Sequence, residues 1–382
     1  MTDAVIVAGA RTPIGRAHKG SLVDVDAFEL AQVAVGDAIN RSGIPLADFD
    51  DIVIAESLQG GGVIARHVAL RLGLPHVPGL ADNRHCAAGL SAVQIAAGSI
   101  RAGMDRVVVA GGTESLSSMP RTLKSIPGSA HDYQPWMSPS HPETPDAPLY
   151  DMSITVGENT ARAAGLTRES VDEWAFHSHQ RAAASIASGW FEEEIVPVGS
   201  FATDEHPRAD TTLERLASLP ALHPEIDGAT VTAGNASGLN DGAAAIVVVA
   251  DDYASANGLT PLARIVSWAS VGDNPARTGL TPILAIPKAL ERAGMKIDDV
   301  DLFEINEAFC AVAVAASRQL GIDHAIVNVN GSGCGLGHPI ACTGTRMVVT
   351  MLHELRRRGQ SVGCVSMCAG GGMGSALVFE LL

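Results

Sequence analysis

Apolar stretches of two different kinds alternate along the first third of the chain. Short, almost uniformly apolar runs predict buried strands at 4–10, 50–57 and 106–110. From Phe28 to Ser42 the apolar positions recur every three to four residues, which predicts a helix that stops at Gly43. A second helix is predicted from Ala65 to Leu72, and GGTES (111–115) predicts a turn after the third strand. Strands that alternate with helices are typical of an α/β fold.

The same order of segments returns in the last third of the chain. DDVDLFEINEA (298–308) resembles the segment around DDIVIAES, and RRRGQSVGCVSMCAGGGMGS (356–375) resembles RAGMDRVVVAGGTES. A helix predicted from Ile283 to Arg292, followed by Gly294, matches the first helix and Gly43. We therefore expect two similar layered halves related by a pseudo-two-fold axis. In this alignment His338 stands opposite Cys86, and each precedes the corresponding helix of its copy.

The segment between the two copies follows neither pattern. Its proline-rich stretch Ser138–Pro148 predicts an irregular loop. A helix is predicted from Thr167 to Gly189, with Thr167 as its cap, and FEEEIVPV (191–198) predicts an edge strand. We interpret this segment as a lid over substrate. The predicted division is an N-terminal half at 1–116 plus 241–252, a lid at 117–240 and a C-terminal half at 253–382.

Length and composition narrow the class of protein. A chain of 382 residues exceeds one hydrophobic core, and its many glycines and few aromatic residues favour close helix–sheet packing. The net charge of −16 argues against a nucleic-acid partner, although a local arginine cluster can still bind a small anion. We see no signal peptide and no apolar run of bilayer length, so we expect no membrane span. The six cysteines form no CxxC pair, which favours a reducing, cytoplasmic compartment.

Four residues carry the candidate chemistry. Cys86 follows a polar run and opens a helical segment, where the helix dipole favours a thiolate; a small buried core thiol is the alternative interpretation. The imidazole of His338 can take the proton of that thiol. Cys368 precedes a glycine run whose backbone N–H groups can approach an oxyanion, and Asn306 can orient a water or a carbonyl.

Five motifs in this order resemble the thiolase family over nearly the whole chain. They are NRHCAAGL (83–90), VTAGNASGLNDGAAA (231–245), NEAF (306–309), LGHP (336–339) and CAGGGMG (368–374). The resemblance implies duplicated βαβαβαββ halves that form a layered αβαβα core with an inserted lid. It also implies that coenzyme A esters are the substrates, and that neither a metal nor a redox cofactor is needed.

The resemblance further assigns catalytic roles. Cys86 attacks the thioester and becomes acylated, with His338 as its base, in a ping-pong reaction. Cys368 removes a proton from the α-carbon of acetyl-CoA in synthesis, and the same residues cleave a 3-ketoacyl-CoA in degradation. One oxyanion hole uses His338 with a water held by Asn306. The second uses the backbone N–H groups of Cys86 and Gly370.

Binding residues also follow from the resemblance. Ser237 matches the serine against the pantetheine arm, and Arg208 matches a lid arginine near the nucleotide. Arg215 either adds a phosphate contact or lies on a solvated face. Met152 and Phe309 complete the predicted set of contacts. Asp151, the residue before Met152, stands where thiolases of the acetoacetyl-making type carry histidine, which leaves room for longer or branched acyl chains.

Several functions remain open at this point. We expect a 3-ketoacyl-CoA thiolase of fatty-acid or side-chain degradation, with acetyl-CoA acetyltransferase as the first alternative. A decarboxylating ketoacyl synthase is disfavoured because Cys368 replaces a second histidine, and a non-catalytic CoA-ester binding protein is disfavoured by the intact reactive residues. Glu173, His177 and His179 lack metal-site spacing, and Cys334 is interpreted as core packing. By resemblance the protein is a homodimer or homotetramer.

Overall fold

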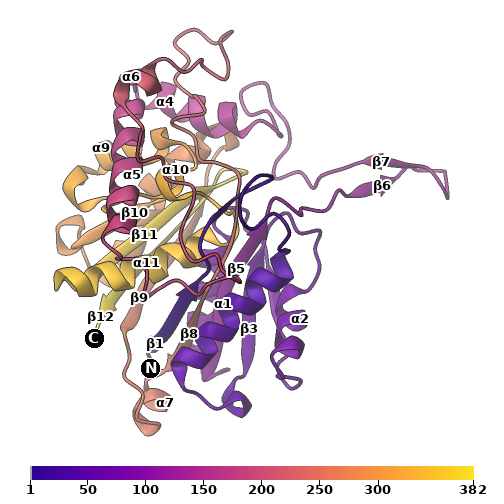
Figure 1. The fold of residues 1–382 in the computed structure, drawn as a ribbon, viewed down its shortest axis with the longest axis vertical. Helices are drawn as coiled ribbons and strands as arrows, with labels where there is room; N and C mark the ends of the chain where they lie inside the picture. The colour runs from indigo at the N-terminus through magenta and orange to yellow at the C-terminus, as the bar shows by residue number, and fades with distance from the viewer. Residues whose placement is uncertain (1) are drawn as a thin grey trace.

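A single mixed β-sheet runs through the computed structural model, which describes residues 2–382 (Figure 1). Its strand order is β10-β11-β12-β9-β1-β8-β5-β3-β4, and β2 pairs with β8. The strands of this sheet are β1 (Ala4–Arg11), β2 (Gly15–Arg16), β3 (Asp51–Glu56), β4 (Leu80–Asp82), β5 (Val107–Ser115), β8 (Asn240–Ala250), β9 (Ala263–Gly272), β10 (Leu302–Ile305), β11 (Val362–Ala369) and β12 (Met373–Leu381). The helices are α1 (Ala27–Ser42), α2 (Ile64–Arg71), α3 (Ala88–Arg101), α4 (Asn159–Ala163), α5 (Arg168–Ala187), α6 (Leu213–Ala217), α7 (Asp251–Ala256), α8 (Pro282–Ala293), α9 (Cys310–Leu320), α10 (Gly333–Leu336) and α11 (Thr343–Arg358).

The sheet consists of two matching parts that meet at a narrow junction. Strands β1 and β9 pair only through Val5–Arg264 and Ile6–Ala263. Outward from this junction, the order β1-β8-β5-β3 on one side corresponds to β9-β12-β11-β10 on the other. Among these four matched strands of each part, only the last pairing is parallel, β3 with β5 or β10 with β11, and β4 adds a further parallel strand beside β3. This is the duplication that the internal repeat predicted.

Three hydrophobic clusters define the layers. One packs α1 and α2 on the outer face of the N-terminal part, and another packs α8 and α9 on the outer face of the C-terminal part. The third contains α3 and α11 with strand residues from both parts, so these helices form the middle layer. The predicted αβαβα layering is therefore confirmed.

The two middle helices approach each other where both are built from small residues. A Cβ atom on Gly89 of α3 would lie 2.6 Å from the carbonyl oxygen of Ala341. A Cβ atom on Gly344 of α11 would lie 2.4 Å from the backbone nitrogen of Leu90. Backbones at this distance leave no space for side chains. The crossing therefore fixes the N-terminal ends of α3 and α11 against each other.

Two sequence-based predictions of local structure are wrong. GGTES is not a turn, because β5 continues to Ser115 and pairs with β8 along its whole length. FEEEIVPV is not an edge strand: it makes only two isolated bridges, Ile195 to Arg11 and Val198 to Phe201. Residues 191–194 form a turn instead, and the Glu194 carboxylate contacts the buried guanidinium of Arg11 at 2.5 Å.

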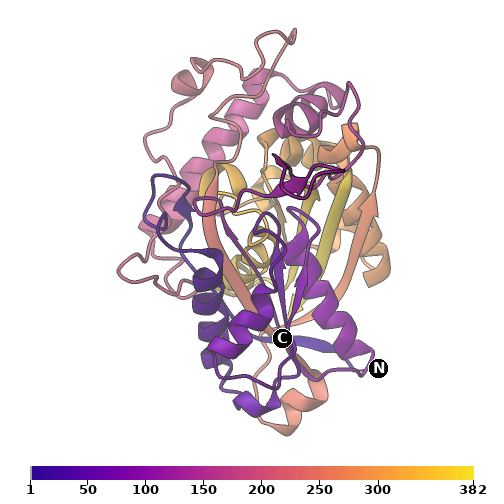
Figure 2. The ribbon, with the colours of Figure 1, turned by 90° about the vertical axis from the view of Figure 1, so that its right-hand side faces the viewer.

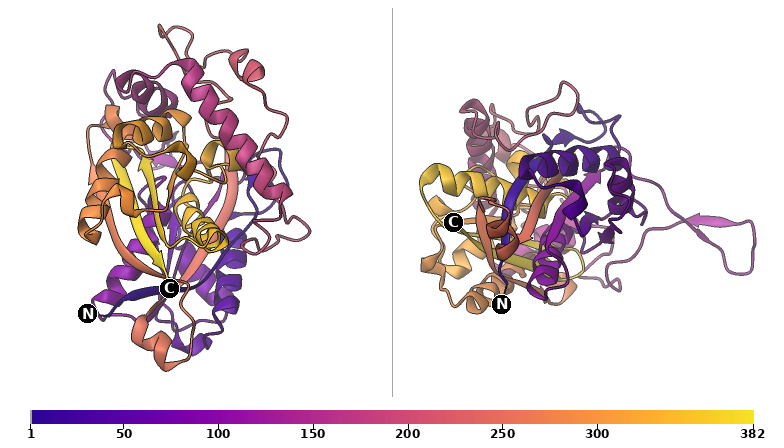
Figure 3. Two further views of the ribbon diagram at one scale, coloured as in Figure 1. Left: turned by 90° about the vertical axis from the view of Figure 1, so that its left-hand side faces the viewer. Right: turned by 90° about the horizontal axis from the view of Figure 1, so that it is seen from below.

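The inserted segment gathers at one end of the molecule (Figure 2). Helix α5 begins as predicted, with the Thr167 side chain accepting a hydrogen bond from the backbone N–H of Ser170. A hairpin of β6 (Leu123–Ser125) and β7 (Tyr133–Pro135) projects away from the body (Figure 3). Strand β8 lies between β1 and β5, which supports its assignment to the N-terminal half; the three-part division stays a prediction. Between residues 2 and 382, no helix is long and apolar enough to cross a membrane.

The helix crossing gives a testable prediction. Gly344→Ala should lower the free energy of unfolding by about 1–3 kcal/mol, because its methyl group has no space against α3. Chemical denaturation followed by circular dichroism measures this change. Gly98→Ala in α3 is the matched control, since a Cβ there would lie 3.8 Å from Trp268; it should be neutral or stabilising. Equal stability of the two variants would contradict this account of the crossing.

Candidate active site

Cys86 lies in the turn that leads from β4 into α3, two residues before the helix begins. The backbone N–H groups of Gly370 and of Cys86 itself favour the charged form of the Cys86 sulfur and lower its pKa. These are the two groups expected to form the second oxyanion hole. The thiol therefore lies beside donors that can stabilise negative charge on it or on an adjacent oxygen.

Cys86, His338 and Cys368 line one cavity of about 310 Å³. Gly370, Ser237, Met152 and Phe309 line the same cavity, so the structure brings together most of the predicted residues. Its walls are largely apolar and come from both the core and the inserted segment: Leu58, Leu116, Met137, Leu149, Val156 and Ile340.

The hydrogen bonds of His338 define its tautomer. Its Nδ1 lies 2.6 Å from the hydroxyl oxygen of Thr343, and that hydroxyl donates its proton to the carbonyl of Pro339 at 2.9 Å. Thr343 must then accept, so Nδ1 carries the proton and Nε2 presents a lone pair. Nε2 lies 3.4 Å from Nδ2 of Asn306, which donates to it. Burial, together with the nearby Arg346, lowers the pKa of His338 to about 3, so the ring is neutral.

Burial also governs the two cysteines. It raises the pKa of Cys86 to about 11, in spite of the two backbone N–H donors that lower it. The expected preference for thiolate at the helix N-terminus is therefore outweighed by desolvation. Burial and the neighbouring Cys86 raise the pKa of Cys368 as well. At neutral pH the resting site holds two thiols and a neutral imidazole, so Cys86 needs a base.

Asn306 is positioned by the buried residues around the NEAF motif. Its backbone N–H donates to the carbonyl of Ser366 in β11 at 2.9 Å, which links the motif to the strand that contains Cys368. The adjacent Glu307 accepts hydrogen bonds from Trp174 at 2.8 Å and from Ser178 at 2.6 Å, both on α5. The inserted segment is thereby tied to the catalytic motif.

The glycine run after Cys368 is required by close contacts. A Cβ on Gly371 would lie 2.7 Å from the carbonyl oxygen of Ser140, and one on Gly372 would lie 2.1 Å from that of Asp273. Both residues have positive φ angles, of 89° and 77°. Only glycine fits this turn without strain. The turn carries Gly370 to its position over Cys86.

The two predicted arginine contacts lie away from this cavity. Arg208 is exposed, and its backbone N–H donates to His179 at 3.3 Å. Arg215 is exposed on α6 and pairs with Asp210 at 2.5 Å. Neither side chain lines the Cys86 cavity, and their contacts with the nucleotide stay predictions.

Comparison with known proteins decides the family. Residues 4–252 match the family "Thiolase, N-terminal domain", and residues 259–381 match "Thiolase, C-terminal domain". The chain belongs to the thiolase family. Membership of this family confirms the fold that the sequence motifs implied. It also confirms that CoA esters are the substrates of the family.

Named relatives of this thiolase carry two functional names. The chain is 41% identical to a 3-ketoacyl-CoA thiolase of Bacillus subtilis and 42% identical to an acetyl-CoA acetyltransferase of Cupriavidus necator, in each case over the full length of both. The crystal structure of human mitochondrial 3-ketoacyl-CoA thiolase in complex with CoA superposes with a TM-score of 0.90 at 34% identity. It covers 100% of this chain and 98% of that one.

Several cavity residues of this thiolase were missed by sequence reasoning. His85 stands inside the NRHC motif, but the sequence pattern indicates a chemical role only for its neighbour Cys86. Ser140 belongs to the stretch Ser138–Pro148, and Met137 directly precedes it; the prolines predicted irregular structure there but did not indicate that it lines a cavity. No sequence pattern indicates a role for Thr343, because only the folded geometry at the start of α11 brings it against His338.

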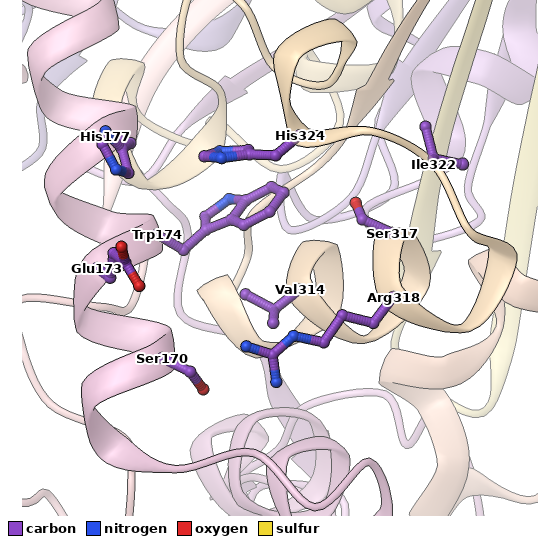
Figure 4. Close-up of a pocket in the computed structure, with 9 residues that line it drawn as sticks. All are labelled: Ser170, Glu173, Trp174, His177, Val314, Ser317, Arg318, Ile322 and His324. Carbon is purple, nitrogen blue, oxygen red and sulfur yellow. The ribbon is translucent and has the colours of Figure 1, made fainter.

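A separate cavity of about 220 Å³ lies between α5 and α9 (Figure 4). Glu173, Trp174 and His177 project into it from α5, opposite Arg318 of α9. None of its lining residues belongs to the Cys86 cavity. His179 lies elsewhere, stacked at 6.2 Å on His206. Over residues 2–382, no three His, Cys, Asp or Glu side chains are grouped as metal ligands would be.

Loss of the Thr343 hydroxyl should impair catalysis through His338. In Thr343→Val the Nδ1 proton loses its acceptor, so the reactive tautomer is no longer enforced. We expect kcat to fall by about 10- to 100-fold with a smaller change in KM. Steady-state kinetics measures both parameters. Thr343→Ser keeps the hydroxyl and should retain most of kcat. If kcat fell equally in Thr343→Ser and Thr343→Val, Thr343 would not be the residue that fixes the tautomer of His338.

The raised pKa of Cys86 predicts the pH dependence of its alkylation. Only the thiolate reacts, and its fraction rises tenfold per pH unit below a pKa of about 11. Iodoacetamide labelling of the Cys86 peptide should therefore accelerate by about a hundredfold between pH 7 and pH 9. Mass spectrometry of that peptide over time gives the rate. A rate that is flat across this range would mean that Cys86 already rests as a thiolate.

Proposed function

We propose that this thiolase cleaves 3-ketoacyl-CoA esters by ping-pong thiolysis through an acyl-Cys86 intermediate. The observation that carries the proposal is the meeting of Cys86, His338 and Cys368 at one cavity. A second thiol opposite a nucleophilic thiol has no use in a binding protein, but carbon–carbon chemistry needs a second proton carrier. This argues against the non-catalytic alternative.

The proposed steps use each side chain once in each half-reaction. Nε2 of His338 takes the thiol proton of Cys86, and the sulfur attacks C3 of the substrate. The bond between C2 and C3 breaks, and Cys368 protonates C2 as acetyl-CoA leaves. Cys368 then takes the proton of an incoming CoA thiol, whose sulfur attacks the acyl group on Cys86. His338 returns its proton to Cys86 as the shortened acyl-CoA leaves.

The carbonyl oxygen gains negative charge in both attacks. The backbone N–H groups of Cys86 and Gly370 supply donors on one side of the cysteine sulfur. On the other side, His338 and Asn306 lie together at 3.4 Å, and we assign this pair to the thioester oxygen with a bridging water. Neither step requires a metal ion or a redox cofactor.

The shape of the site supports acyl chains longer than acetoacetyl. The Cys86 cavity adjoins a second cavity of about 880 Å³, and the two share Ser57, Leu58, His85, Met137, Ser138 and Tyr150. A chain attached to Cys86 can extend into this space. The position before Met152, where acetoacetyl-making thiolases carry histidine, holds Asp151, which accepts a hydrogen bond from the backbone N–H of Ser153 and lies 3.4 Å from His223. Acetyl-CoA acetyltransferase activity is the second candidate, favoured by the names of several relatives.

We place CoA along the inserted segment. Ser237 lines the cavity and its backbone N–H donates to Ala308 at 2.9 Å, which fixes it beside Phe309 for the pantetheine arm. Arg208 is exposed and forms no salt bridge within residues 2–382, so its charge is available to the phosphates. Arg215 is the weaker candidate, since Asp210 already pairs with it.

The proposal also includes the oligomeric state and the cellular compartment of the protein. A homo-oligomer, dimer or tetramer, is supported by the apolar side chains that the projecting hairpin exposes, including Leu123 and Tyr133. A cytoplasmic location is supported by cysteines that are all free over residues 2–382.

Chain-length kinetics test the substrate assignment. With CoA as co-substrate, kcat/KM for a six- to ten-carbon 3-ketoacyl-CoA should exceed that for acetoacetyl-CoA by about tenfold, as expected when added methylenes are buried in an apolar site. The rate of cleavage is measured from the decrease in the absorbance of the enolate form of the 3-ketoacyl-CoA substrate. Turnover of the four-carbon substrate alone would refute the degradative assignment and leave acetyl-CoA acetyltransferase.

Two cysteine variants separate the half-reactions. Cys86→Ala should abolish the acyl-enzyme, because it removes the sulfur that attacks the substrate in the proposed steps. Cys368→Ala should still be acylated by an acyl-CoA, while carbon–carbon cleavage falls by at least about a thousandfold. Intact-protein mass spectrometry detects the adduct, and Cys364→Ala, a buried cysteine outside the cavity, is the matched control. Full turnover by Cys368→Ala would show that its assigned role is wrong.

A further inference from the structure

The residue before the nucleophile has an unusual backbone conformation. His85 has a φ angle of 45°, in the left-handed region that few non-glycine residues adopt. Its backbone N–H donates to the side chain of Asn83 at 2.8 Å, and its carbonyl accepts from Ala88 at 3.0 Å. Strained residues of this kind persist where the surrounding structure holds them, and they cluster at functional sites.

The imidazole of His85 lies at the junction of the two cavities and lines both. Its Cγ and Cδ2 atoms lie 4.0 Å from the position that a Cβ would take on Gly370, so the ring packs beside the expected oxyanion donor. Burial, and secondarily His141, lowers the pKa of His85 below its usual value, so the ring is neutral at pH 7. A neutral imidazole offers one donor and one acceptor.

Both ring nitrogens of His85 are without a hydrogen-bond partner among residues 2–382. The nearby His141 is different: its Nδ1 lies 2.8 Å from the Ser140 hydroxyl and its Nε2 lies 3.1 Å from the carbonyl of Ala147. His141 is thus a satisfied structural histidine. The donor and the acceptor of His85 remain available to whatever occupies the junction, and the mechanism above does not use them.

We propose that His85 is a specificity-determining residue that selects 3-ketoacyl-CoA esters whose acyl chain carries a hydroxyl group beyond C3. This inference rests on the proposed function, because an acyl group on Cys86 must pass the neighbouring imidazole to reach the larger cavity. A hydroxyl is both donor and acceptor, so it matches the two free positions of the ring.

The selectivity follows from desolvation. Leu58 and Met137 also line the junction, so a saturated chain would displace water and leave the imidazole nitrogens unpaired. Leaving a buried polar group without a partner is costly, and a site built to bind a polar group therefore rejects the analogue that lacks it. A hydroxylated chain of equal length restores the lost hydrogen bond.

The experiment compares kcat/KM for eight-carbon 3-ketoacyl-CoA esters, one unsubstituted and three with a hydroxyl at C5, C6 or C7. At least one hydroxylated ester should be preferred by about tenfold over the unsubstituted one. In His85→Gly, which suits a positive φ but lacks the ring, this ratio should fall to within about twofold of unity. In His85→Asn, which also tolerates the conformation and keeps an amide, part of the preference should remain.

His18→Gly is the matched control. His18 also has a positive φ angle, of 66°, but it is exposed and lines neither cavity, so the substrate ratio should not change. If His85→Gly lowers kcat/KM for all four esters by the same factor, the residue has only a structural role and the inference is overturned. Equal cleavage of all four by the unaltered enzyme would overturn the inference but leave the proposed function intact. Turnover of none of them would overturn the proposed function itself, and the inference with it.

Discussion

The close crossing of α3 and α11 is the constraint on which the active site depends. Gly89 and Gly344 allow the two backbones to touch, and both helices are enclosed by strands from the two halves of the sheet. Cys86 precedes α3 by two residues, and His338 precedes α11 by five. Because the crossing fixes both N-terminal ends, it brings the proposed nucleophile and its proposed base to one cavity. The duplication of the fold thus places one reactive residue at each equivalent position.

The same burial that creates the site also sets its protonation state. Desolvation raises the pKa of Cys86 and lowers that of His338, so proton transfer between them is unfavourable until a substrate oxygen takes up the developing charge. The backbone donors of Cys86 and Gly370 are already in place for that charge. Thr343 determines which nitrogen of His338 acts. Reactivity is therefore coupled to the bound thioester, and in the free enzyme the thiols of Cys86 and Cys368 stay protonated.

Periodicity and repetition predicted the layered fold and the order of its elements, because each helix and strand buries a regular apolar face. The motifs likewise predicted which reactive residues meet, since Cys86, His338 and Cys368 all stand at the ends of regular elements. The prediction from residue type was wrong at GGTES: the small residues indicated a turn, but strand β5 continues there between strands β3 and β8. It was wrong again at 191–198, where the pairing of Glu194 with Arg11 depends on residues about 180 positions apart. Thr343 and His85 could not be assigned from sequence, since their roles arise from tertiary contacts and from one backbone angle.

The inserted segment is less like a hinged lid than its sequence suggested. Arg181 of α5 donates to the carbonyls of Val327, Asn328 and His324, and Trp174 and Ser178 bind Glu307 beside Asn306. Moving α5 would break these buried bonds and disturb the catalytic motif itself. Helix α5 is therefore a fixed support behind the NEAF motif. The part of the inserted segment that does line the cavity is the irregular stretch from Met137 to Met152, which makes few backbone hydrogen bonds of its own and is therefore held less tightly than α5.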